Sequence, residues 1–338
     1  MTLAEWLLWP LSLPYGAAAH LRARAYETGL LRQQRLDGVV ISVGNLTVGG
    51  TGKTPMVLWI AQRLLADGKR VGILTRGYRG EAENTATGEP TSDEVRLLKA
   101  RLGSQVAFGV SANRFAAGQK LSCQGVGWFV LDDGFQHLSV ARDVDIVVID
   151  ASNPFGGGRL LPAGRLREPR TALSRADIVV ISRSSHAPAI EAAVRRDSDA
   201  PIFYARPQLE AVRIFRGAYP GDEEANARSQ KLFAFCGIGN PNAFVADLRS
   251  WDFDVGAYKF FPDHRRYTPR DIAAIEREAR AAGSGGVICT EKDIFNLGGV
   301  DLRALEVRYC SISMCVDNET EFWRTVTETI EAQCRKSR

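Results

Sequence analysis

The chain lacks the sequence patterns of several common sites. Its 338 residues hold six scattered cysteines, without a Cys-x-x-Cys pair or zinc-ligand spacing, and only four histidines. Cysteines in apolar stretches behave as small buried hydrophobic residues, so we expect all six to be structural in a reducing compartment. No fixed-period repeat or low-complexity segment occurs. The composition, 45% hydrophobic and 24% charged, excludes a wholly disordered chain, and the length allows two domains.

A strong excess of charge is also missing. The formal net charge is only +4, whereas a dedicated nucleic-acid binder is expected to carry a much stronger basic stripe. The mild positive charge fits a protein that handles anions. The sequence predicts no nucleic-acid partner and gives no sign of an obligate protein partner.

The N-terminal segment, residues 1–36, has no uninterrupted apolar run. Residues 3–19 are apolar but contain Glu5, Pro10 and Pro14, while a spanning helix needs about 20 continuous apolar residues. The segment also lacks the basic start of a secretory signal. Apolar residues at helical spacing followed by arginines suit either an interfacial helix or a helix packed on the protein's own core. These residues are Leu3, Trp6, Leu7, Pro10 and Leu11, then Arg22, Arg24, Arg32 and Arg35.

From residue 37 the pattern alternates short Val/Ile/Leu runs with helical patterns, which predicts an α/β fold with a parallel sheet covered on both faces. The polar stretch 217–231 marks the candidate boundary. We therefore expect a nucleotide-binding domain over 37–222 and a smaller α/β domain over 223–338. The final helix, 319–334, either closes that second domain or returns to the first.

What the sequence does contain is a phosphate-binding loop. A β-branched run at 39–43 leads into a glycine-rich turn ending in Gly52-Lys53-Thr54, and a helical pattern begins at once. Glycines let backbone N–H groups turn toward phosphate oxygens, the lysine reaches the β- and γ-phosphates, and the threonine hydroxyl binds Mg²⁺. The usual first glycine is replaced by Thr47. The predicted nucleotide-binding residues are Thr47, Gly49, Gly50, Thr51, Gly52, Lys53 and Thr54.

A second strand supplies acidic residues. The apolar run 128–131 ends in Asp132 and Asp133, the position from which P-loop proteins present a carboxylate to Mg²⁺. Alone, such an Asp-Asp-Gly turn is more often just a turn. Together with Lys53 and Thr54, it predicts that both aspartates contact the metal.

These motifs resemble those of the tetraacyldisaccharide 4′-kinase (lipid A 4′-kinase) family over nearly the whole chain. The phosphate loop is generic, but the Asp-Asp-Gly-Phe-Gln-His block and the Leu-Pro-Ala-Gly block ending in Arg-Glu-Pro are far more specific. The matching blocks are Val43–Pro55, Thr75–Gly80, Ser92–Glu94, Leu131–His137, Leu161–Pro169, Phe261–His264 and Thr290–Asp293.

The resemblance implies ATP- and Mg²⁺-dependent phosphorylation of the 4′-hydroxyl of a tetraacylated glucosamine disaccharide 1-phosphate, in lipid A biosynthesis. It also implies a peripheral protein at the cytoplasmic face of the inner membrane, held there by its N-terminal helix. A cleft between two α/β domains is expected to take the lipid-linked sugar.

The resemblance also assigns roles to individual residues. Asp93 is the expected base for the attacking hydroxyl, and His264 is expected to orient it and share the proton. Because these two residues lie on opposite sides of the predicted boundary, their cooperation requires the domains to close. Arg167 is expected to neutralise phosphate charge, with Arg165 as the alternative. Further expectations are a metal or supporting role for Glu94 and sugar contacts by Arg76 and Tyr78, while Lys292 and Asp293 have no predicted role.

A rival interpretation is a membrane-tethered ATPase or GTPase switch. It would share Lys53, Thr54 and Asp132. A GTPase should carry an Asn/Thr-Lys-x-Asp base-reading motif, and the sequence at 290–293 has that order altered. The two interpretations differ in nucleotide use, since a kinase consumes ATP only when its acceptor is present.

Overall fold

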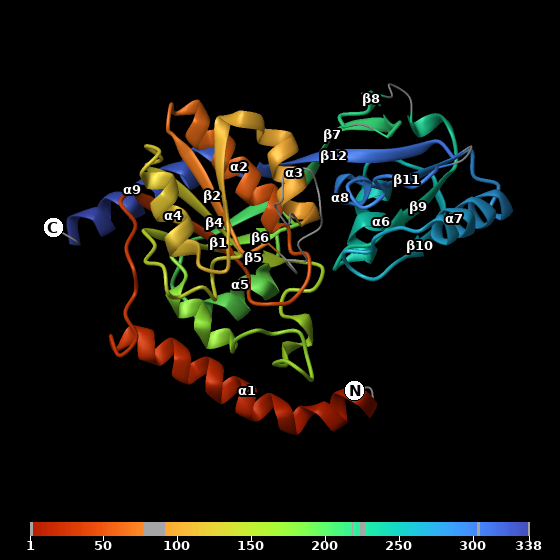
Figure 1. Cartoon of the computed structure of the whole chain (residues 1–338). Helices are drawn as coiled ribbons and strands as arrows, with labels where there is room; N and C mark the ends of the chain where they lie inside the picture. The colour runs from red at the N-terminus through yellow and green to blue at the C-terminus, as the bar shows by residue number, and fades with distance from the viewer. Residues whose placement is uncertain (1–2, 78–91, 218, 224–226, 303–304, 337–338) are drawn as a thin grey trace. The chain divides into compact units, whose positions relative to one another are not determined.

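The computed structural model describes the chain except for residues 1–2, 78–91, 218, 224–226, 303–304 and 337–338. It divides into two compact units (Figure 1). The first unit comprises residues 1–81, 102–206 and 314–338, and the second comprises residues 82–101 and 207–313. The chain therefore passes between the units four times.

The first unit contains a parallel sheet in the order β7-β6-β5-β1-β4-β2-β3. Most of its strand residues are buried, as expected for Val- and Ile-rich strands covered on both faces. The strands are β1 (Val39–Gly44), β2 (Val71–Thr75), β3 (Val106–Val110), β4 (Trp128–Asp132), β5 (Val144–Asp150), β6 (Ile178–Ser182) and β7 (Ile202–Phe215), of which β7 continues into the second unit from residue 207.

Helices cover both faces of this sheet. Alternate residues of β4 and β5, such as Phe129 and Val147, pack with Leu121 of α4 and Val194 of α5. The intervening strand residues face the opposite side, where α2 and α9 meet through Trp59 and Phe322, with ring centroids 5.4 Å apart. The helices of this unit are α1 (Leu3–Glu27), α2 (Lys53–Ala66), α4 (Arg114–Ser122), α5 (Pro188–Arg195) and α9 (Glu319–Lys336). Short 3₁₀ turns lie at Gly103–Gln105, Gly156–Gly158 and Arg170–Arg175.

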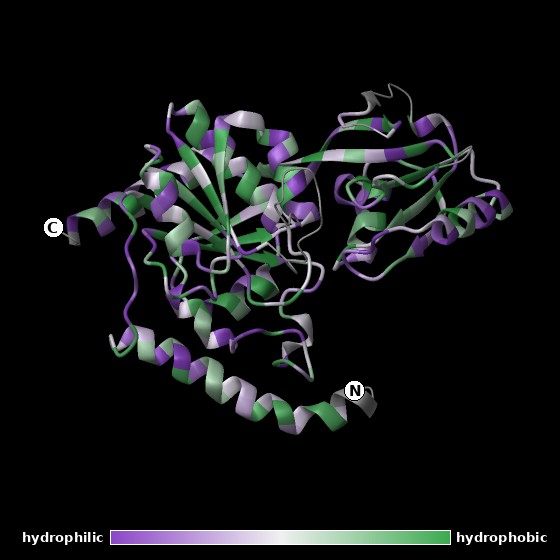
Figure 2. Ribbon diagram, viewed as in Figure 1, coloured by the Kyte–Doolittle hydropathy of each residue, from purple (hydrophilic) through white to green (hydrophobic). Residues whose placement is uncertain are grey.

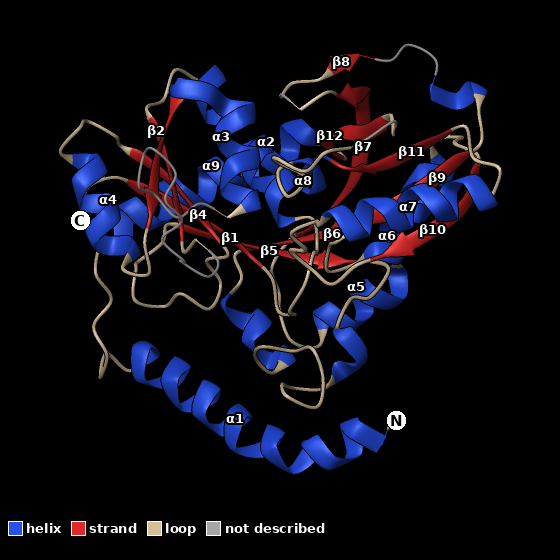
Figure 3. Cartoon of the chain, turned by 45° about the vertical axis from the view of Figure 1, so that its right-hand side comes forward, coloured by secondary structure: helices blue, strands red, loops and turns tan. Residues whose placement is uncertain are grey.

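The second unit is a smaller α/β layer with parallel strands in the order β10-β9-β11-β12 (Figure 3). Helix α6 packs on one face and α7 on the other, because alternate residues of β9 belong to separate clusters with each helix. Its elements are α3 (Asp93–Leu102), β8 (Asp222–Glu223), a 3₁₀ turn (Ala227–Ser229), β9 (Leu232–Cys236), α6 (Pro241–Ser250), β10 (Val255–Phe260), α7 (Pro269–Ala281), β11 (Gly286–Thr290), α8 (Glu291–Ile294) and β12 (Val307–Val316).

The predicted α/β class with a parallel sheet and a second α/β domain is confirmed. The division of the chain differs from the predicted boundaries. Residues 82–101 belong to the second unit, because the side chains of α3 bind residues that follow β11, as described below. The crossing that lies nearest the predicted boundary falls at 206/207 instead of 222/223, and α9 returns to the first unit.

Helix α1 is continuous through Pro10 and Pro14. It exposes a row of large apolar side chains, of which Trp6 is 68% and Trp9 51% accessible. Figure 2 shows this apolar character along the N-terminal part of the helix. Among the helices of the described residues, none combines the length and the hydropathy required to cross a bilayer.

Candidate active site

The loop between β1 and α2 has the backbone form of a phosphate-binding loop. Gly49 and Gly52 have φ angles of +105° and +86°, in the left-handed region that favours glycine. Helix α2 begins at Lys53, so its first N–H groups point into the loop. The hydroxyl of Thr51 is buried and has no hydrogen-bond partner among the described residues. The role of these residues in nucleotide binding stays a prediction.

Lys53 is held in place by two oxygen atoms. Its Nζ donates to Oδ1 of Asn45 at 3.0 Å and lies 3.4 Å from Oδ1 of Asp133. Asn45 in turn donates to the carbonyl of Thr47 at 2.7 Å. Asn45 therefore braces both the lysine and the loop backbone, a role that the motif alone did not predict.

Asp132 and Asp133 lie at the carboxyl end of β4, beside the phosphate loop. Asp132 is the register partner of Val43 on β1, and its Oδ2 accepts a hydrogen bond from Thr75 at 3.1 Å. The turn after Asp133 lies so close to β1 that a Cβ on Gly44 would lie 2.5 Å from the backbone nitrogen of Phe135. Glycine is required at position 44 because two site segments meet there.

Residues 159–168, called the arginine loop below, form a wall of the same site. Thr47 and Leu166 form an antiparallel bridge, and the N–H of Arg167 donates to the carbonyl of Leu46 at 2.8 Å. The guanidinium of Arg165 donates to the carbonyl of Val48 at 2.9 Å. Arg165 therefore clamps the phosphate loop itself.

Arg167 points to the acidic end of β4 instead. Its Nη1 lies 2.8 Å from Oδ1 and 2.7 Å from Oδ2 of Asp133. The carboxylate thus lies between this guanidinium and the Lys53 ammonium. Of the two candidate arginines, Arg167 is the one whose charge lies beside the phosphate-loop lysine.

The charge balance keeps Asp133 ionised. Burial raises the pKa of its carboxyl, but Lys53, Arg167 and Arg114 outweigh burial and hold the pKa well below its ordinary value. Arg114, the first residue of α4, is buried and donates to the carbonyl of Asp133 at 3.2 Å. No sequence signal marked Arg114, because an arginine at the start of a helix has no distinctive pattern.

The donor set of the first unit fits a magnesium ion bound together with phosphate. Mg²⁺ prefers oxygen ligands and keeps several waters, so one or two protein ligands suffice. The Thr54 hydroxyl and the buried Asp132 carboxylate supply oxygen donors of this kind, and their metal role stays a prediction. Among the described residues no group of three or more His, Cys, Asp or Glu could hold a metal without phosphate. Asp133 is engaged by two cations, so its metal role stays a prediction.

The second unit holds the predicted acid–base pair. Asp93 begins α3, and Nδ1 of His264 lies 2.9 Å from its Oδ1 and 3.0 Å from its Oδ2. His264 has a φ of +58° in the turn after β10, and its N–H donates to the carbonyl of Gly237. Asn296 donates to Oδ2 of Asp93 at 3.1 Å. Both residues of the pair belong to one unit, so the expectation that domain closure brings them together was wrong.

The pair is electrostatically coupled. Burial raises the pKa of Asp93, but the hydrogen bond from His264 and the charge of Lys292 reverse this and hold its pKa well below the ordinary value. The hydrogen bond to Asp93 raises the pKa of His264, against the opposing effect of burial. Asp93 is therefore an ionised acceptor near neutral pH.

Lys292 and Asp293, which had no predicted role, support this pair. Lys292 donates to Oε1 of Glu94 at 2.9 Å. Asp293 caps α8 and accepts from the N–H of Gly237 at 2.8 Å and from Tyr267 at 2.7 Å. Because Gly237 also binds the backbone of His264, Asp293 fixes the turn that carries the histidine.

Glu94 lies in the second unit, whereas Thr54 and Asp132 lie in the first. Its metal role stays a prediction. Arg76 follows β2 and is exposed, and Tyr78 lies outside the described residues.

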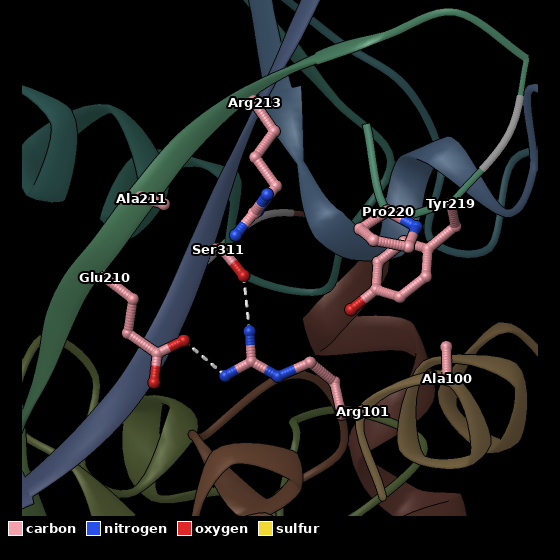
Figure 4. Close-up of a pocket in the computed structure, with 8 residues that line it drawn as sticks. All are labelled: Ala100, Arg101, Glu210, Ala211, Arg213, Tyr219, Pro220 and Ser311. Carbon is pink, nitrogen blue, oxygen red and sulfur yellow. Dashed lines mark hydrogen bonds and ion pairs between the residues drawn. The ribbon is translucent and has the colours of Figure 1, made fainter. Parts of the chain in front are cut away.

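A separate pocket of about 360 Å³ lies in the second unit (Figure 4). Arg101 donates to Glu210 at 2.5 Å and to Ser311, and it lies 3.4 Å from the buried carboxylate of Glu291. Tyr219 also donates to Glu291, at 2.9 Å. The charge of Arg101 is therefore compensated by two carboxylates of the same unit, Glu210 and Glu291.

The sheet, the phosphate loop and the acidic strand end define the first unit as a P-loop nucleotide-binding protein of the kinase type. The sequence pattern described as tetraacyldisaccharide-1-P 4′-kinase matches residues 4–331. The chain belongs to this family.

Two relatives and one solved structure of the same family are similar to this chain. A tetraacyldisaccharide 4′-kinase of Geobacter metallireducens is 40% identical over 328 residues, covering 90% of this chain and 92% of the relative. One of Anaeromyxobacter dehalogenans is 40% identical, covering 84% and 79%. The crystal structure of LpxK from Aquifex aeolicus in complex with ATP has a TM-score of 0.71 and 26% identity, covering 97% of this chain and all of that one.

Proposed function

We propose that this chain transfers the γ-phosphate of ATP to the 4′-hydroxyl of a tetraacylated glucosamine disaccharide 1-phosphate, in lipid A biosynthesis. The observation that carries the proposal is the Asp93–His264 pair. It gives a chain with a complete phosphate loop a base for an acceptor hydroxyl. A nucleotide switch needs no such pair, because its nucleophile is water positioned near the loop.

The first unit provides the phosphate-binding part of the reaction. Backbone N–H groups of residues 49–54 and the Lys53 ammonium hold the triphosphate. Arg167, once it exchanges Asp133 for phosphate oxygens, adds a guanidinium where charge accumulates during transfer. Thr54 and Asp132 would hold the magnesium ion, which neutralises phosphate charge when bound.

The second unit provides the base. Asp93 accepts the proton of the 4′-hydroxyl as the oxygen–phosphorus bond forms and the bond to the β,γ-bridging oxygen breaks, which releases ADP. His264 and Asn296 hold the carboxylate in one orientation. Since Asp93 is ionised near neutral pH, it can accept the proton without prior deprotonation.

We propose that α1 lies on the cytoplasmic face of the inner membrane as a peripheral anchor. Its exposed side chains suit the boundary between lipid headgroups and acyl chains. Arg24 and Arg32 follow the apolar stretch and are exposed, which favours an anionic leaflet. The exposed apolar residues are Trp6, Leu7, Leu8, Trp9, Leu11, Leu13 and Leu21 on α1, followed by Leu30 and Leu31.

The proposal is tested by incubating the protein with γ-labelled ATP, Mg²⁺ and the monophosphorylated disaccharide lipid, followed by lipid extraction. We expect label in the lipid phase, dependent on Lys53 and absent without the acceptor lipid. Label that appears only as free phosphate, with or without lipid, would instead support a nucleotide switch.

A further inference from the structure

Helix α1 has a polar side that faces the protein. The Ser12 hydroxyl donates to the carbonyl of Leu160 at 3.0 Å and accepts from the N–H of Ala163 at 3.2 Å. One turn later, the Tyr15 hydroxyl donates to the carbonyl of Arg167 at 3.0 Å. The three backbone groups that bind Ser12 and Tyr15 all belong to the arginine loop.

The contact between helix and loop is close. A Cβ on Gly16 would lie 2.6 Å from Cδ1 of Leu160. Ser12 is buried there, although the apolar residues on the other side of α1 are exposed. The helix thus directs its hydroxyl groups toward the protein and its large apolar side chains toward solvent, the reverse of an ordinary surface helix.

The loop connects this helix to the phosphate site. The same Arg167 whose carbonyl accepts from Tyr15 donates its N–H to Leu46 and its guanidinium to Asp133. Arg167 therefore contacts α1 through its carbonyl, the phosphate loop through its N–H and the acidic end of β4 through its guanidinium. The position of its backbone depends on both hydrogen bonds.

We propose that Ser12 and Tyr15 are positioning residues for Arg167, so that the seating of α1 on a lipid surface sets the geometry of the phosphate site. The choice of a lipid surface rests on the proposed function. A bilayer would fix the orientation of the helix, and the two hydroxyl groups would transmit that orientation to the arginine loop. Lipid binding and nucleotide binding are then thermodynamically linked, each strengthening the other.

The test uses the full chain and measures the affinity for a fluorescent ATP analogue, with and without vesicles of phosphatidylglycerol and phosphatidylethanolamine. For the unmodified chain we expect vesicles to tighten nucleotide binding roughly three- to ten-fold, the range of one hydrogen bond. In Tyr15→Phe and Ser12→Ala/Tyr15→Phe this response should shrink or vanish, while co-sedimentation with vesicles stays unchanged.

Tyr26→Phe is the matched control, because Tyr26 lies on the same helix and stacks near Arg22 without a hydrogen bond to the arginine loop. It should keep the full response. Hydrogen exchange of residues 159–168 gives a second readout and should speed up in Tyr15→Phe. An unchanged vesicle response in the double variant, or no response in the unmodified chain, would overturn the proposal.

Nucleotide affinity is measured without any acceptor lipid. A failure of phosphate transfer would therefore count against the proposed function alone, and a missing vesicle response would count against the coupling alone.

Discussion

The Nδ1 atom of His264 lies within 3.0 Å of both carboxylate oxygens of Asp93, although 171 positions separate the two residues in the sequence. Helix α3 and the turn after β10 belong to the same compact unit. The pair is therefore assembled by the folding of that unit.

Replacing Asp93 should remove the base but spare nucleotide binding. We expect Asp93→Asn to lower kcat by roughly 10²–10⁴-fold, the usual contribution of a general base. The Kd for ATP should change little, because the phosphate loop belongs to the other unit. Steady-state kinetics and calorimetric ATP titration check this. A variant with full turnover would remove Asp93 from the mechanism.

The protonation of His264 gives a second prediction. Its hydrogen bond to Asp93 raises its pKa above the ordinary 6.5. The stabilisation from the pair is therefore fully present below pH 6.5 and is lost as the pH rises through the raised value. In Asp93→Asn the pKa of His264 should fall, as followed by NMR titration of the imidazole. His137, whose pKa burial and nearby arginines lower to about 4, is the internal control and should not move.

Asn296 should act through Asp93. Asn296→Ala removes the amide that binds Oδ2 of Asp93 and is expected to lower kcat roughly ten-fold, because a hydrogen bond to a charged group is lost. The KM for ATP should stay constant. Asn242→Ala, an exposed position on α6, is the matched control. Equal losses in the two variants would show that the effect is not specific to the pair.

The two aspartates at the end of β4 should differ in metal dependence. We expect Asp132→Asn to raise the Mg²⁺ concentration for half-maximal rate roughly ten-fold or more, because a ligand loses its charge. Asp133→Asn should instead weaken the placement of Lys53 and Arg167 and lower the rate at saturating Mg²⁺. Metal titrations of both variants separate these roles, and an unchanged Mg²⁺ requirement in Asp132→Asn would contradict the assignment. Chelation of the metal should abolish transfer in every case.

Arg101 should matter for stability. Arg101→Met leaves Glu291 buried without its cation, which costs about 3–5 kcal/mol for a buried pair. The loss should be smaller in Arg101→Met/Glu291→Gln, where the carboxylate that remains, Glu210, is exposed to solvent. Urea unfolding followed by tryptophan fluorescence measures both. A double variant no more stable than the single one would indicate that other partners of Arg101 dominate.

Local signals in the sequence predicted much of the fold. The runs at 39–43 and 128–131 form β1 and β4, and the final helix α9 begins at the predicted residue 319. The helix over α1 was harder to predict, because Pro10 and Pro14 interrupt the pattern although the helix accommodates both. These features depend on residues within a few positions of one another.

The division of the chain could not be predicted in the same way. Residues 82–101 join the second unit because Arg96 binds the carbonyl of Phe295 and the side chain of Asn296, almost 200 positions away. A single boundary in the sequence cannot describe a chain that crosses between its units four times. For the same reason Asn296 was missed, since its partner Asp93 lies 203 positions away, and Arg114 acquires its role from Asp133 at the end of another element.

The account depends most on where the phosphate goes. Phosphorus NMR and tandem mass spectrometry of the lipid extracted after reaction with ATP and Mg²⁺ locate it directly. We predict one new phosphomonoester on the 4′-oxygen of the disaccharide, formed by the unmodified chain and absent with Lys53→Ala. Phosphate on another oxygen, or an unmodified lipid beside hydrolysed ATP, would contradict the account.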